Sequence, residues 1–152
     1  MNKKIIIGIL TILLISGIVA LLKNSEDNQA AFAATVYKSP TCGCCTVYGQ
    51  YLKRQGVDVE TVTIDDLSNS KEENGIPREL ESCHTSVVGG YVVEGHVPLP
   101  VIETFLEKSP DIKGIALPGM PAGSPGMPGL KQGKWTIYAI AHDGSVSEFM
   151  DY

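Results

Sequence analysis

The spacing of hydrophobic positions changes several times after residue 34, and each spacing predicts a new element. Residues 35–37 form a short β-rich run. Apolar residues then recur on one face at helical spacing over residues 44–55, and Gly56 ends that pattern. Residues 57–64 alternate and are rich in β-branched side chains, which is typical of a strand. This part of the chain is therefore predicted to be a β–α–β unit.

The next stretch predicts a second unit, made of two strands and a helix. Residues 65–81 are polar and leave room for one short helix. Residues 85–88 and 91–93 are predicted strands, because Gly89-Gly90 between them is a strong hairpin signal. Residues 99–108 have amphipathic helical spacing, with prolines that favour a helix start. The predicted class is α/β, with the β–α–β then β–β–α order of a thioredoxin-like fold.

The C-terminal part is predicted to contain a loop and a hairpin. Residues 117–129 are so rich in proline, glycine and methionine that both helix and strand are excluded. Residues 135–141 and 146–150 are predicted strands, with Asp143-Gly144 in the turn between them.

The N-terminus carries a separate signal. Ile5–Leu22 is an uncharged run of 18 residues preceded by two lysines, a length between that of a signal peptide and that of a membrane span. Ala31-Phe32-Ala33 has the form of a signal-peptidase site. We expect residues 1–34 to be a signal peptide or a membrane anchor with a spacer, and both stay open. The domain of residues 35–152 is then exported, to the periplasm or another extracytoplasmic space, and is tethered to the membrane if the anchor is retained.

The charge of the domain limits its partners. Three of the twelve basic residues and two of the seventeen acidic residues precede Ala34, which leaves nine basic and fifteen acidic residues in the domain. Nucleic-acid binding needs a basic face. The acidic balance therefore argues against a nucleic-acid partner.

All four cysteines lie in two short groups, Cys42-Gly43-Cys44-Cys45 and Cys83-His84. The first group falls at the predicted junction of strand and helix, where the helix dipole and free N–H groups favour a thiolate. In a thioredoxin-like fold, the segment before the third core strand faces that junction. We therefore expect the two groups to meet in space.

Three features favour a metal site over disulfide exchange. Cys44 adds a third thiol that a dithiol enzyme does not need. Cys83-His84 offers a ligand pair at the place where thioredoxins usually have a proline. Met120 and Met127 add thioethers, and thiolate with thioether selects Cu(I) over harder metals.

Other interpretations stay open at this point. Cys42 and Cys45 have the C-x-x-C spacing of a thiol–disulfide oxidoreductase. An exported protein also favours disulfides, so two ordinary disulfides, one of them joining the motif to Cys83, are a second alternative. A third is a structural zinc site with four thiolates, which the adjacency of Cys44 and Cys45 disfavours.

Four segments resemble the CopG-type exported proteins, a metal-binding family associated with copper resistance. The resemblance spans about Val36–Met127, and its segments are Tyr37–Cys45, Ser82–Thr85, Gly90–Pro98 and Pro118–Met127. It implies a thioredoxin-like fold, a Cu(I)–thiolate cluster and a copper redox role. The cysteines carry over as ligands, and four further residues carry over as neighbours of the site: His84, His96, Met120 and Met127.

We therefore expect an exported copper protein of copper resistance. Consecutive Cys44 and Cys45 are awkward ligands for one tetrahedral ion, whereas bridging thiolates relax the geometry. This predicts a polynuclear Cu(I) cluster with His84 and His96 at its edge. Imidazole tolerates Cu(II) better than thiolate does, so a copper oxidoreductase is a further hypothesis. The expected partners are copper ions and other copper-resistance or copper-transport proteins. His142 is expected to be a solvated turn residue.

Overall fold

The structure is a computed structural model that describes Asn2 and residues 32–152. The N-terminal export segment expected over residues 1–34 therefore lies almost wholly outside the described residues. Within the described part of the chain, no helix combines the length and apolar character needed to cross a membrane.

The domain is built on one mixed sheet of seven strands in the order β2-β1-β3-β4-β5-β6-β7. β1 runs parallel to β2, β4 runs parallel to β5, and the other neighbours are antiparallel. The strands are β1 (Ala33–Lys38), β2 (Asp58–Thr63), β3 (His84–Val88), β4 (Tyr91–Gly95), β5 (Gly114–Leu117), β6 (Thr136–Ile140) and β7 (Val146–Asp151).

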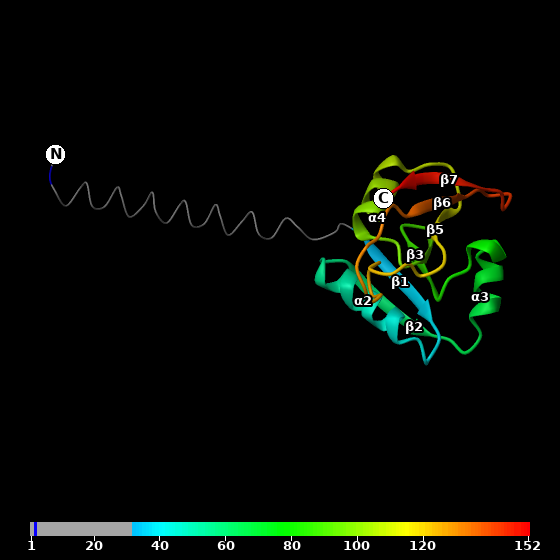
Figure 1. Cartoon of the computed structure of the whole chain (residues 1–152), viewed down its shortest axis with the longest axis horizontal. Helices are drawn as coiled ribbons and strands as arrows, with labels where there is room; N and C mark the ends of the chain where they lie inside the picture. The colour runs from blue at the N-terminus through cyan, green and yellow to red at the C-terminus, as the bar shows by residue number, and fades with distance from the viewer. Residues whose placement is uncertain (1, 3–31) are drawn as a thin grey trace. The chain divides into compact units, whose positions relative to one another are not determined.

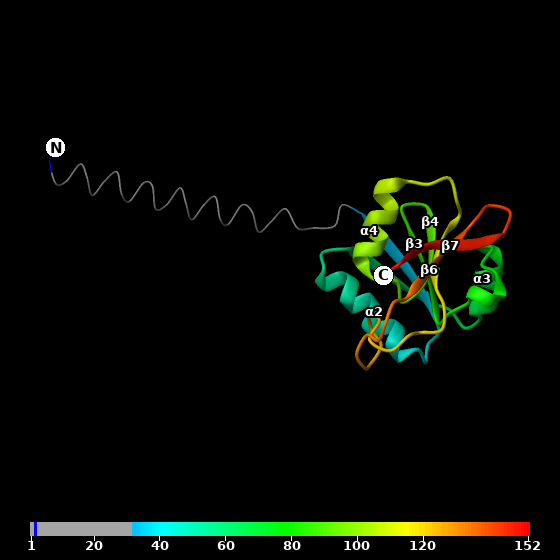
Figure 2. The ribbon, with the colours of Figure 1, turned by 45° about the horizontal axis from the view of Figure 1, so that its top comes forward.

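Three helices in the described residues cover this sheet: α2 (Gly43–Arg54), α3 (Leu67–Glu73) and α4 (Leu99–Lys108). Figures 1 and 2 show α2 and α4 together on one side of the sheet and α3 on the other. A single 3₁₀ turn, Arg78–Leu80, leads from α3 toward β3. The core lies between the sheet and the α2/α4 layer, where Leu52, Ile102 and Phe105 are almost completely buried.

The predicted α/β class and the order β–α–β then β–β–α are confirmed. The helix predicted over residues 99–108 has those bounds. The loop predicted over residues 117–129 starts one residue later than expected, because Leu117 ends strand β5, and residues 118–129 contain neither helix nor strand. Gly89 and Gly90 both have positive φ, as the hairpin signal requires. The thioredoxin-like classification itself stays a prediction.

The sequence analysis missed β5, which is only four residues long and fully buried. The first residue of β5 is Gly114. The backbone passes so close to β4 at this position that a Cβ would overlap the carbonyl group of Val92, so only glycine fits. β5 pairs with both β4 and β6. The C-terminal hairpin is therefore an extension of the same sheet and not a separate element.

Candidate metal centre

The first cysteine group is positioned by the start of α2. Cys42 is the N-cap residue, and its Sγ accepts a hydrogen bond from the Cys45 amide at 3.2 Å. A disulfide joins Cys42 and Cys45, whose Cα atoms are 5.4 Å apart. Cys44 keeps a free thiol on the same turn. Sulfur therefore occupies the helix N-terminus, where unpaired N–H groups stabilise negative charge.

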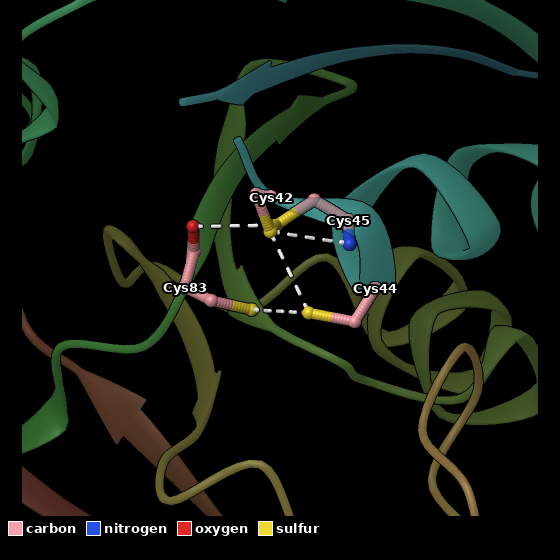
Figure 3. A group of neighbouring side chains, drawn as sticks. All are labelled: Cys42, Cys44, Cys45 and Cys83. Carbon is pink, nitrogen blue, oxygen red and sulfur yellow. Dashed lines mark hydrogen bonds between the residues drawn. A yellow bond between two sulfur atoms is a disulfide. The ribbon is translucent and has the colours of Figure 1, made fainter. Parts of the chain in front are cut away.

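The second group reaches this turn through the pairing of β1 with β3. Their antiparallel register places His84 opposite Lys38 at the end of β1, so Cys83 lies directly before the paired segment. The Cys44 and Cys83 Sγ atoms are 3.9 Å apart, and the Cys42 and Cys44 Sγ atoms are 3.5 Å apart. All four sulfurs lie within 4.8 Å of one another (Figure 3). The expected meeting of the two cysteine groups is confirmed.

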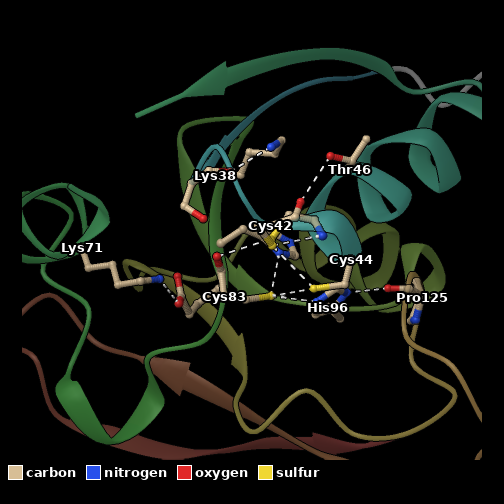
Figure 4. The surroundings of a disulfide bond; sticks show 12 residues. Lys38, Cys42, Cys44, Thr46, Lys71, Cys83, His96 and Pro125 are labelled. Atoms are coloured by element: carbon tan, nitrogen blue, oxygen red, sulfur yellow. Dashed lines mark hydrogen bonds and ion pairs between the residues drawn. A yellow bond between two sulfur atoms is a disulfide. The ribbon is translucent and has the colours of Figure 1, made fainter. Parts of the chain in front are cut away.

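His96 presents one nitrogen to this sulfur cluster. Its Nδ1 lies 2.6 Å from the Pro125 carbonyl oxygen (Figure 4). A carbonyl only accepts, so Nδ1 carries the proton and Nε2 carries the lone pair. Nε2 is 2.8 Å from the Cys83 Sγ. Burial lowers the pKa of His96, which keeps the ring neutral. A neutral imidazole with a backbone-bonded Nδ1–H is the usual form of a metal-ligating histidine.

His84 is the second histidine at the cluster. Its Nδ1 lies 3.4 Å from the Cys83 Sγ, and its ring centroid lies 4.7 Å from that of His96. Its Nε2 is buried and has no hydrogen-bond partner among the described residues. Burial, with further contributions from the neighbouring His96 and Lys71, holds the pKa of His84 well below its usual range. Cys83, His84 and His96 thus form a second, mixed set of neighbouring ligands.

Cys83 links the two ligand sets and is held as a neutral thiol. Burial raises the pKa of Cys83 to about 12, and the neighbouring Cys44 adds to the rise. Metal binding to Cys83 therefore requires the release of a proton. The buried site disfavours a free Cys83 thiolate, so a bound cation would take the place of the thiol proton.

The proline- and glycine-rich loop covers the cysteine turn. A Cβ at Gly126 would lie 2.8 Å from the Cys44 carbonyl oxygen and 2.9 Å from the Tyr48 amide nitrogen. Only glycine fits there, because its φ is +87° and the backbone of the loop rests directly on α2. The loop is therefore an ordered cover over the site.

Comparison with known proteins places the domain in a family. A family model described as a protein of unknown function, DUF411, matches residues 80–127. Two solved forms of a copper resistance protein, CopG, resemble the chain over most of its length. Form 1 is 37% identical with a TM-score of 0.72, over 79% of this chain and 96% of that chain. Form 2 is 36% identical with a TM-score of 0.74, over 81% of this chain and 99% of that chain.

The chain belongs to the CopG family. The resemblance found in the sequence is thereby confirmed. No curated protein sequence matches the chain. The seven-stranded α/β domain described above is the fold shared with the CopG structures, since both alignments cover nearly all of their chains.

In this CopG-family chain, the predicted site residues fall into two groups. The four cysteines, His84 and His96 are brought together. Met127 is half-buried and directly follows Gly126, whereas Met120 is 40% exposed. The role of these methionines as ligands stays a prediction. His142 is exposed and lies 3.1 Å from Asp111, as expected of a solvated turn residue.

Sequence reasoning missed the residues that support the CopG-family site. Tyr48 is fully buried and donates its hydroxyl hydrogen to the Val97 carbonyl at 2.9 Å. Its ring contacts that of His84 in a tilted arrangement, with 4.4 Å between centroids. Lys71 and Glu94 form a buried ion pair. Glu94 had a signal, because a carboxylate inside an apolar strand pattern needs a partner. Lys71 had none, since its surroundings in the sequence are polar.

Proposed function

We propose that this protein binds copper in the service of copper resistance and holds several Cu(I) ions in a cysteine-bridged cluster. The observation that carries the proposal is the convergence of four sulfurs within 4.8 Å from two distant parts of the chain. Thiolate ligands are soft and favour Cu(I) and other thiophilic ions. Membership of the CopG family, whose solved members are copper resistance proteins, supports copper as the metal.

The consecutive cysteines favour more than one ion. Cys44 is half-buried and directed toward Cys83, whereas Cys45 is fully buried and lies 3.4 Å, through its Sγ, from the Cys83 carbonyl oxygen. Two neighbouring thiolates with such different surroundings are poor ligands for one tetrahedral ion. Bridging sulfurs shared between Cu(I) ions relieve this constraint. His84 and His96 lie at the edge of the cluster, where each has a ring nitrogen next to the Cys83 Sγ.

The Cys42–Cys45 disulfide makes copper loading dependent on redox state. With the disulfide formed, only Cys44 and Cys83 are available as thiols. Two electrons and two protons convert the disulfide to two thiols, and all four sulfurs then become ligands. Oxidised protein should therefore bind fewer Cu(I) ions than reduced protein.

The decisive experiment is an anaerobic Cu(I) titration of the domain, reduced and oxidised, against a competing chelator. Reduced protein should saturate above one ion per chain, and Cys83→Ser should lower that number. Ser86→Ala is the matched control, because Ser86 is a buried residue of β3 whose hydroxyl has no hydrogen-bond partner within the described chain. Saturation at a single ion, unaffected by Cys83→Ser, contradicts the cluster.

The same sulfurs support a copper redox reaction. Two Cu(II) ions accept one electron each from the Cys42 and Cys45 thiolates, which yields two Cu(I) ions and the disulfide. An external dithiol then restores the thiolates. His84 and His96 suit the Cu(II) substrate, because imidazole accepts both oxidation states. Reduced protein mixed with Cu(II) should form Cu(I) and disulfide in a ratio of two to one, and His84→Ala should change the rate. An unaltered rate in His84→Ala removes that histidine from the reaction.

The disulfide also favours a second candidate, a thiol–disulfide oxidoreductase. Cys42 and Cys45 sit at a helix N-terminus with the spacing such enzymes use. In that case Cys44→Ala leaves insulin reduction intact and Cys45→Ala abolishes it. We expect negligible insulin reduction, because Cys44 lies 3.5 Å from the Cys42 Sγ and competes with any external thiol. Activity near that of a thioredoxin would reverse this ranking.

We further propose that the protein is exported, with residues 1–34 as signal peptide or anchor. The support is the apolar run after a basic start. Protease added to intact spheroplasts should digest the domain, and protection of the domain would contradict export. The copper partners expected there are other resistance or transport proteins that deliver or receive the ions.

A further inference from the structure

A buried charged network lies next to the cluster on the opposite face of the sheet. The side chains of Lys71 and Glu94 are 6% and 0% exposed and form an ion pair. Lys71 comes from α3 and Glu94 from β4 (Figure 4 shows Lys71). Successive strand residues point to opposite faces. His84 packs against Tyr48 of α2, so Thr85 points toward the α3 face, where it contacts Lys71 and Glu94.

The Glu94 carboxylate holds the chain on both sides of Cys83 and His84. One oxygen accepts the Ser82 amide N–H at 2.6 Å, and the other accepts the Thr85 hydroxyl at 2.6 Å. Lys71 also donates to the Thr85 hydroxyl at 3.2 Å. The segment Ser82–Thr85 is therefore fastened at its two ends to one carboxylate. The two residues between these ends carry the ligand atoms.

The arrangement is more costly than the fold requires. Two charges removed from water incur a desolvation penalty that their attraction often fails to recover, and apolar residues of similar volume frequently serve stability as well or better. An apolar pair cannot accept hydrogen bonds from the Ser82 amide and the Thr85 hydroxyl at the same time, as the two oxygens of the Glu94 carboxylate do. Ligand positioning of this kind is the usual role of hydrogen-bonded carboxylates around metal sites.

We propose that Lys71 and Glu94 are positioning residues of the copper site, and that their ion pair fixes Cys83 against Cys44 and His96. The role in copper binding rests on the proposed copper function, whereas the positioning of Cys83 can be tested in the protein without copper. Loss of the pair should free the Ser82–Thr85 segment, so that the Cys83 thiol leaves its position 2.8 Å from the His96 Nε2.

The apo-protein experiment uses the free thiols as reporters. In the oxidised domain Cys44 and Cys83 are free, so iodoacetamide labelling of each is followed by mass spectrometry. The main variant is Lys71→Met with Glu94→Leu, which removes both buried charges of the pair and both carboxylate oxygens that hold Ser82 and Thr85. Labelling of Cys83 should rise several-fold, while Cys44 labelling stays within error of the wild type. Lys134→Met, which removes the exposed ion pair with Asp151, is the control and should change neither rate.

Thr85→Val keeps the test decisive if the double variant does not fold. It preserves shape and removes one of the two attachments to Glu94, so Cys83 labelling should again rise. Unchanged Cys83 labelling in a folded variant, as judged by near-ultraviolet circular dichroism, overturns the proposal and leaves the pair a purely structural role.

Cu(I) binding measurements distinguish a failure of the positioning role from a failure of the proposed copper function. Chelator competition should show Cu(I) affinity about 10- to 100-fold weaker in the double variant than in the wild type, the range typical of lost outer-shell partners. A wild-type protein that takes up no Cu(I) refutes the copper function, and the labelling result still decides the positioning role. Wild-type uptake with equal affinity in the double variant refutes the positioning role alone.

Discussion

Gly126→Ala should lift the proline- and glycine-rich loop away from the cysteine turn. The added methyl group meets the Cys44 carbonyl oxygen at 2.8 Å and the Tyr48 amide nitrogen at 2.9 Å, and both are backbone atoms of α2 that cannot turn aside. The residue must also keep a φ of +87°. Left-handed backbone costs about 1–2 kcal/mol for a residue with a Cβ. Overpacking adds about 1–3 kcal/mol.

The sum is roughly 2–5 kcal/mol, which the domain relieves by releasing the loop. Gly119→Ala is the matched control, because Gly119 lies in the same loop with a φ of +76° and a Cβ there meets nothing within 4 Å. The Gly119→Ala variant should lose only the free energy that the left-handed backbone costs, about 1–2 kcal/mol.

Two measurements test this prediction. Chemical denaturation should show a larger loss of unfolding free energy for Gly126→Ala than for Gly119→Ala. Alkylation of Cys44 in the oxidised protein should be faster in Gly126→Ala alone, because the loop no longer covers that turn. If the two variants are equally stable and label alike, the loop is not packed on α2 in solution and the reasoning from the Cys44 and Tyr48 contacts is wrong.

Three further predictions follow from the same contacts. Tyr48→Phe leaves the Val97 carbonyl without its 2.9 Å partner and should cost about 1–3 kcal/mol of unfolding free energy, measured by denaturation; no loss would mean that water replaces the hydroxyl. The pKa of Cys83 rises from 9.0 to about 12 on folding, so its stabilising effect is complete below pH 9 and disappears as the pH rises toward 12. The oxidised wild type should therefore lose stability relative to Cys83→Ser over that window, and parallel curves would contradict the raised pKa. Met120→Leu with Met127→Leu should keep the fold but change the rate of Cu(I) exchange with a chelator; an unchanged rate assigns these methionines to packing alone.

The cysteine cluster was predictable from the sequence because its signals are local. The motif stands where a β-rich run meets a helical pattern, and the hairpin signal at Gly89-Gly90 fixes which strand follows Cys83. Together with the expected thioredoxin-like order of elements, in which the segment before the third core strand faces that junction, these two signals predict that the thiols meet without knowledge of any side-chain contact. β5 was not predictable in the same way. Its four buried residues have no period, and its identity as a strand depends on the partners on both sides.

The support of the site was hidden for a different reason. Lys71 lies in a polar stretch that predicts a solvated surface, yet its side chain is only 6% exposed because it pairs with Glu94 on the α3 face of the sheet. The burial of a charge depends on a partner 23 residues away, and neither residue reveals that pairing alone. The Cys42–Cys45 disulfide was equally undetermined, since three thiols in four residues permit several pairings.

His96 shows how the loop and the metal site become one unit. Its Nε2 faces Cys83 and has a free lone pair only while Nδ1 carries the proton, and the Pro125 carbonyl, 29 residues along the chain, favours that tautomer. The next residue, Gly126, holds the same part of the loop on the Cys44 turn. One segment of the loop thus fixes the tautomer of His96 and covers the Cys44 turn. Displacement of this loop segment would therefore free the His96 tautomer and expose Cys44 together, so access to the cysteine turn and the state of the imidazole depend on the same contact.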